Sequence, residues 1–134
     1  MDSKIRQPIV KTVHEIEYIY KDGKWNTNYP YKLTEGKITP NGDGSFTFEG
    51  TGRGMIEFST LPIGKTLCVK FKPISHSVAD LHLIKPSTYR AYIRDDINAT
   101  GSWFRTLGMQ IDGVIQIYVS GNYYSYKIYE IFIY

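Results

Sequence analysis

The feature that most constrains this chain is a two-residue alternation of apolar and polar side chains, interrupted by turn residues about every eight to twelve positions. In residues 67–72, for example, Leu67, Val69 and Phe71 alternate with a cysteine and two lysines. Successive side chains of a strand point to opposite faces, so such segments form half-buried strands. No segment shows an apolar stripe of helical period and length. The pattern predicts an all-β fold, an antiparallel β-sandwich of jelly-roll type, with a closed β-barrel as the alternative.

The length fits one domain. The chain has 134 residues and shows no internal repeat or linker. We divide it into a polar N-terminal arm (residues 1–12) and a single β-sandwich domain (residues 13–134). The first residues carry no apolar run after their charges, and the longest apolar stretches have only strand length. We therefore expect synthesis in the cytoplasm without a signal peptide, and no insertion into a membrane.

Several turns follow from local residue signals. Asp22-Gly23 is a strong signal for a two-residue hairpin, because both positions tolerate a positive φ. Asp112-Gly113 is predicted to join residues 103–111 and 114–119 as a second hairpin. The glycine-rich residues 50–54 are predicted to form a loop, and Gly121-Asn122 is predicted to form a turn. The predicted pairs of the first hairpin are Tyr20 with Trp25, Tyr18 with Thr27 and Ile16 with Tyr29.

Aromatic residues supply the candidate binding sites. The chain holds 12 Tyr, 6 Phe and 2 Trp, and tyrosine tolerates contact with water. In the predicted register one face of the first hairpin carries an aromatic platform that could hold a sugar ring, although the same face could be a wall of the core. A second cluster lies at the predicted turn near residue 122 and is expected at the surface. The first candidate set is Tyr18, Tyr20, Trp25 and Tyr29, and the second is Tyr123, Tyr124 and Tyr126.

The sequence gives no positive sign of catalysis, a metal or a cofactor. The histidines His14, His76 and His82 lack metal-ligand spacing, and no nucleophile motif appears. Cys68 alternates with lysines and is interpreted as a small, half-buried residue. Residues 41–45 resemble part of a calcium loop but are better interpreted as a glycine-rich hairpin turn. A small sandwich hydrolase stays a third function class, because two carboxylates distant in sequence can converge in a cleft.

Charge argues against a nucleic-acid partner. The net charge is only +3, which does not demand a polyanion. Arg90, Tyr92 and Arg94 share one strand face and could stack bases, but a solvated outer face is the preferred interpretation.

The closing third carries a resemblance to a known group of modules. Residues 103–105, 109–119 and 127–131 combine an Ile-Asp-Gly hairpin signal with apolar strands. They resemble the last strands of lectin-like jelly-roll modules, which recur in phage tail fibres, baseplates and capsid decorations and in carbohydrate-binding modules. The resemblance implies adhesion or assembly rather than catalysis, and it carries over no individual binding residue.

These observations lead to a hypothesis with one principal alternative. We expect a non-enzymatic structural or adhesion module located in a phage virion, assembling with itself or with other virion subunits and contacting a host-surface glycan. The alternative is a free-standing carbohydrate-binding module.

Overall fold

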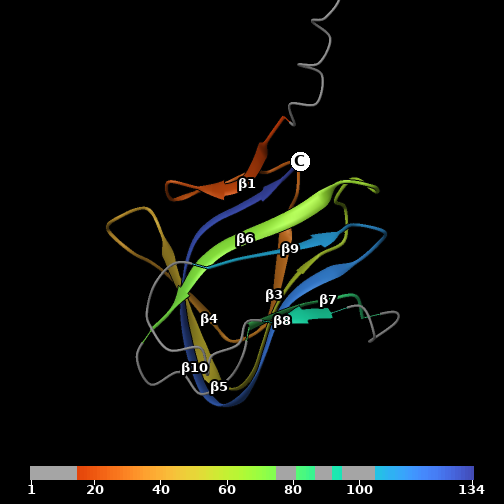
Figure 1. Cartoon of the computed structure of the whole chain (residues 1–134). Coiled ribbons are helices and arrows are strands. Elements are labelled where there is room, and N and C mark those ends of the chain that lie inside the picture. The colour runs from red at the N-terminus through yellow and green to blue at the C-terminus, as the bar shows by residue number, and fades with distance from the viewer. Residues whose placement is uncertain (1–14, 75–80, 87–91, 95–104) are drawn as a thin grey trace, which may run out of the picture.

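The structure is a computed structural model that describes residues 15–74, 81–86, 92–94 and 105–134 (Figure 1). Every regular element in these residues is a β-strand, and none of them forms a helix able to cross a membrane. The predicted N-terminal arm, His14, His76 and Arg90 lie outside the described residues. The strands are β1 (Glu17–Lys21), β2 (Lys24–Trp25), β3 (Tyr31–Glu35), β4 (Lys37–Pro40), β5 (Phe46–Phe58), β6 (Thr66–Pro73), β7 (Leu81–Ile84), β8 (Tyr92–Arg94), β9 (Arg105–Gln110) and β10 (Ile115–Ile133).

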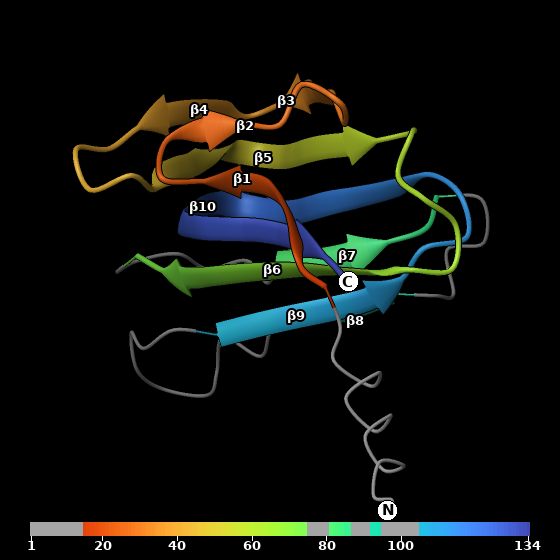
Figure 2. The same cartoon turned by 90° about the horizontal axis from the view of Figure 1, so that it is seen from above.

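A long antiparallel ribbon of β5 and β10 joins two layers of strands. The ribbon runs from the pair Ile115–Phe58 to the pair Ile128–Phe46, with a register shift between Gly121 and Tyr124. The first part of β10 also pairs with β7, whereas the second part pairs with β6 and then with β1. The ribbon bends between these parts, so β6 and β9 lie over β7 and β8 (Figures 1 and 2).

The side chains between the layers are apolar. The inward positions of β5, β6 and the first part of β10 are almost completely inaccessible to solvent, as the alternation predicts. Because burial of apolar surface is the main driving force of folding, this set defines the core. Its members include Phe46, Phe48, Ile56, Phe58, Leu67, Val69, Phe71, Ile115, Ile117 and Val119.

The predicted antiparallel β-sandwich is confirmed. All the strand pairs are antiparallel, and β2, β3, β4, β8 and β9 each pair with a single neighbour within the described ranges. The described strands therefore leave open edges and do not form the alternative closed barrel.

The first predicted hairpin exists, but it is short. Asp22 and Gly23 have φ values of 51° and 80°, which suits a two-residue turn, and Tyr20 pairs with Trp25 as predicted. The ladder then ends, because the Asn26 side chain accepts a hydrogen bond from the Asn28 backbone (2.9 Å) and turns the chain away. The further predicted pairs, Tyr18 with Thr27 and Ile16 with Tyr29, are wrong.

The second predicted hairpin is wrong. Asp112-Gly113 joins β9 to β10, but β9 pairs with β6, and the start of β10 pairs with β5 and β7. The connection therefore crosses from one layer to the other. A local turn signal cannot distinguish a hairpin from a crossover, because the strands beside β10 come from distant parts of the sequence.

The predicted loop at residues 50–54 and the turn at Gly121-Asn122 are also wrong, because both segments continue as strand. The glycines instead allow a close approach of the buried Tyr124 ring. A Cβ atom at Gly50 would lie 2.6 Å from Tyr124 Oη. The same hydroxyl donates a hydrogen bond to the Arg53 carbonyl oxygen at 2.9 Å, which fixes the ring at the bend of the ribbon.

Candidate functional site

The outer face of the layer that contains β5, β7 and the first part of β10 is hollowed. Its depression has a volume of about 460 Å³. The strands place its side chains on the face opposite to the buried Ile56, Leu83 and Ile117. The lining residues are Arg53, Met55, His82, Ile84, Pro86, Gln116 and Tyr118.

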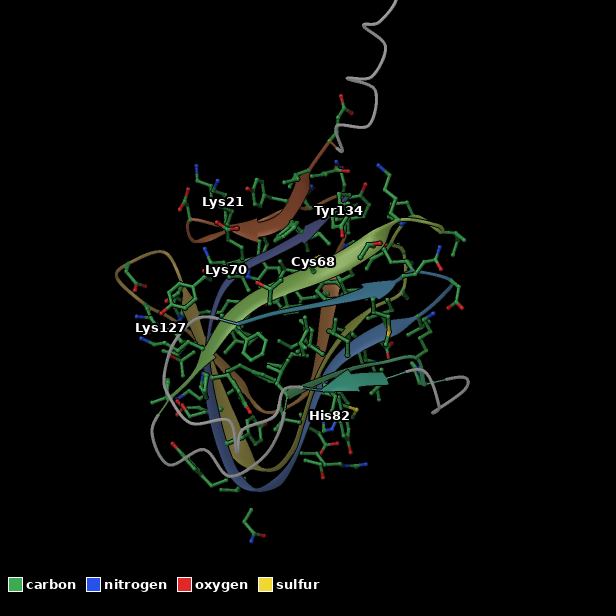
Figure 3. All side chains as sticks on the ribbon, viewed as in Figure 1. Lys21, Cys68, Lys70, His82, Lys127 and Tyr134 are labelled. Atoms are coloured by element: carbon green, nitrogen blue, oxygen red, sulfur yellow. The ribbon has the colours of Figure 1, made fainter. Side chains whose placement is uncertain are left out.

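Strand register brings these residues together. Tyr118 of β10 pairs with Met55 of β5 on one side and with His82 of β7 on the other. The ring centroids of Tyr118 and His82 are 6.1 Å apart. Figure 3 shows His82 far from Lys21 and Tyr134, which lie at the opposite end of the molecule. The depression therefore belongs to a different surface from the one that carries Tyr18 on β1.

Two polar side chains of the depression are held in place by neighbouring carboxylates. Arg53 forms an ion pair with Glu35 of β3 (3.0 Å), and both side chains are partly exposed. The Gln116 amide nitrogen donates a hydrogen bond to the Glu57 carboxylate at 2.8 Å. Held side chains lose less conformational entropy when they bind a ligand.

The depression combines an apolar surface with a few polar groups. Met55, Ile84 and the Tyr118 ring offer surfaces for C–H groups, while Arg53 and Gln116 offer donors and an acceptor. This combination is typical of small-molecule sites. It suits a ligand with apolar ring faces and a hydroxylated rim.

The first candidate set is brought together only in part: the rings of Tyr20 and Trp25 pack against each other, with centroids 4.8 Å apart. A bulge in β1 between Tyr18 and Tyr20 shifts the register against β10, so both Ile19 and Tyr20 are buried. Tyr18 lies on the outside beside Phe132, with ring centroids 5.9 Å apart. Tyr20 is only 2% exposed and belongs to the core.

The two other members of this set are partly buried and engaged. Trp25 packs against the core and stacks on Tyr31, with ring centroids 4.0 Å apart. The Tyr29 hydroxyl donates a hydrogen bond to a Glu17 carboxylate oxygen at 2.9 Å. Ligand binding at Tyr18, Trp25 and Tyr29 stays a prediction from the sequence.

The second predicted cluster is divided by strand β10. Tyr123 is 38% exposed, and its role in binding stays a prediction. Tyr124 and Tyr126 are fully buried, so their predicted position at the surface is wrong. The reason is that residues 121–122 do not form a turn, and the strand carries these two rings into the interior.

Sequence reasoning missed the residues of the depression. The alternation around the buried Ile117 already indicates that Gln116 and Tyr118 share the opposite face. Their neighbours Met55 and His82 are distant in sequence, and no local signal reveals that β5 and β7 flank β10.

Two further groups that the sequence singles out, the Cys68 thiol and the Asp43 carboxylate, are buried or hydrogen-bonded. Burial raises the pKa of the Cys68 thiol, as expected for an unreactive side chain. Within the turn at residues 41–45, Asp43 pairs with Lys127 (2.6 Å) and accepts hydrogen bonds from Ser45, and these contacts lower the Asp43 pKa. In the described ranges no three His, Cys, Asp or Glu side chains gather as metal ligands.

Neither a family model nor a curated protein sequence matches the chain. Several solved structures with the same architecture are carbohydrate-binding modules. A family 29 variant complexed with cellulohexaose is 14% identical (TM-score 0.60), with 88% of this chain and 89% of that chain covered. Another family 29 variant, complexed with mannohexaose, is 12% identical (TM-score 0.60), with the same coverage. A family 61 module in complex with beta-1,4-galactotriose is 13% identical (TM-score 0.54), with 88% and 98% covered. The chain has the β-sandwich fold of these carbohydrate-binding modules.

Proposed function

We propose that this protein is a non-enzymatic carbohydrate-binding module that binds an oligosaccharide chain in the depression between β5, β10 and β7. The observation that carries the proposal is the depression itself, which places the Tyr118 ring beside Arg53, Gln116 and His82. The Tyr118 ring would pack against the C–H face of a sugar, and the three polar side chains would bind its hydroxyl groups.

The fold supports this proposal over the virion role. The solved neighbours are carbohydrate-binding modules, and three of them were obtained with bound oligosaccharides. The guanidinium of Arg53 is already paired with the Glu35 carboxylate, so we propose a neutral rather than a charged sugar. Location in a phage virion and assembly with virion subunits stay predictions from the sequence.

The test is calorimetric titration of the protein with cellulohexaose, mannohexaose and beta-1,4-galactotriose. We expect a micromolar to millimolar Kd for at least one of them. Loss of the stacking surface in Tyr118→Ala should weaken that binding at least about tenfold.

The matched control is Tyr134→Ala, which removes a partly exposed tyrosine outside the depression, at the opposite end of the molecule (Figure 3). This variant should bind as the wild type does. A Tyr118→Ala variant that keeps wild-type affinity would place the site elsewhere. A wild-type chain that binds none of the three oligosaccharides would contradict the proposal for these ligands.

A further inference from the structure

The hydrogen bond between Gln116 and Glu57 couples the depression to a residue that does not line it. Gln116 is 9% exposed and lies in register between Glu57 of β5 and Ile84 of β7. Its Nε2 atom donates a hydrogen bond to Glu57 Oε1 at 2.8 Å. Ile84 lines the depression on the other side of Gln116, whereas Glu57 does not.

The chemistry of the two groups fixes the orientation of the amide. An ionised carboxylate only accepts hydrogen bonds, whereas an amide presents an acceptor oxygen and a donor nitrogen that can exchange places by rotation. Glu57 therefore holds the nitrogen of Gln116 toward β5. The amide oxygen then points away from β5, and one N–H of the amide is not used by Glu57.

We propose that Glu57 is a positioning residue of the carbohydrate site, which selects the orientation of the Gln116 amide and so presents its oxygen as an acceptor for a sugar hydroxyl. This inference rests on the proposed function. Without Glu57 the Gln116 amide populates both orientations, and only one of them presents the oxygen to the sugar. The apparent affinity for the sugar therefore falls in proportion to the fraction of molecules in that orientation.

The test is a double-mutant cycle of Glu57→Ala and Gln116→Ala, with Kd measured for whichever of the three oligosaccharides binds the wild type. We expect Glu57→Ala to weaken binding about two- to fivefold when Gln116 is present. In the Gln116→Ala background the same change should have almost no effect, because the group that Glu57 orients is then missing. Glu57→Gln should weaken binding much as Glu57→Ala does, because its amide can either accept from Gln116 or donate to it and therefore no longer selects one orientation.

A spectroscopic readout separates positioning from a general loss of structure. In the ligand-free protein, the side-chain NH₂ signals of Gln116 in a ¹⁵N–¹H spectrum should shift and exchange faster with water in Glu57→Ala. The matched control is Glu49→Ala, because Glu49 lies on the same strand but pairs with the second part of β10, remote from the depression. This control should leave the Gln116 signals and the Kd unchanged.

The outcomes distinguish this inference from the proposed function. If the wild type binds an oligosaccharide but Glu57→Ala weakens binding equally in both backgrounds, the positioning role is wrong and carbohydrate binding stands. Unchanged Gln116 signals in Glu57→Ala would also overturn the positioning role. If the wild type binds none of the three oligosaccharides, the proposed function is contradicted for these ligands. The ¹⁵N–¹H spectrum of the ligand-free protein then still shows whether Glu57 orients the Gln116 amide.

Discussion

The bend of the β5–β10 ribbon depends on the absence of a side chain at Gly54. In Gly54→Ala the new Cβ would lie 2.6 Å from Tyr124 Cζ and 2.7 Å from Phe48 Cζ. Both rings are fully buried, so neither can move into solvent to relieve the contact. Overpacking of a core typically costs about 1–3 kcal/mol, and contacts with two rigid rings place this change near the upper limit. We expect a loss of about 3 kcal/mol.

Urea unfolding followed by fluorescence measures this change, and for a domain of this size it corresponds to a drop of roughly 10 °C in Tm. Gly42→Ala is the matched control, because a Cβ at Gly42 meets no atom within 4 Å. That control should be as stable as the wild type. If Gly54→Ala unfolds within about 1 kcal/mol of the wild type, the packing of Tyr124 against the ribbon is not as described.

Two further predictions concern other parts of the molecule. The pKa of Asp43 is lowered by its contacts with Lys127 and Ser45, so its stabilising effect is complete above the unfolded-state pKa of about 4 and is lost as the pH falls further. Asp43→Asn should therefore be less stable than the wild type at pH 7, and the difference in urea midpoint should be smaller at pH 3. An equal difference at both pH values would show that the ion pair of Asp43 with Lys127 does not stabilise the fold. Cys68 is 6% exposed and burial raises the pKa of its thiol, so a thiol reagent such as DTNB should react at least about a hundredfold more slowly with the native than with the unfolded protein. Similar rates in both states would show that the thiol is accessible.

Local sequence patterns predict a strand and its buried face well where the alternation of apolar and polar residues alone determines which side chains are buried. The alternation in β6 identifies Leu67, Val69 and Phe71 as core residues, and all three are fully buried. The Asp22-Gly23 turn is predicted correctly because its geometry depends on two adjacent residues. Fold class and turn type are in this sense local properties of the sequence.

Features that depend on distant partners are not visible in the sequence. The same Asp-Gly signal fails at residues 112–113, because β9 and β10 take their partners from other strands. Gly50 and Gly54 look like parts of a loop, yet they allow the close approach of Tyr124, whose hydroxyl bonds to a residue 71 positions earlier in the sequence.

The candidate site shows the same limit. A single bulge after Tyr18 separates side chains that strict alternation would place together. The face of Tyr118 follows from the sequence, but its neighbours in the depression follow only from the pairing of β10 with β5 and β7.

Titration of ¹⁵N-labelled protein with cellulohexaose, mannohexaose or beta-1,4-galactotriose tests the proposed binding site, because it locates the ligand on the surface. We expect the largest chemical-shift changes on the backbone amides of Met55, His82 and Tyr118, which line the depression. Changes centred on Tyr18 and Phe132, at the opposite end of the molecule, or no changes with any of the three, would contradict the proposed site.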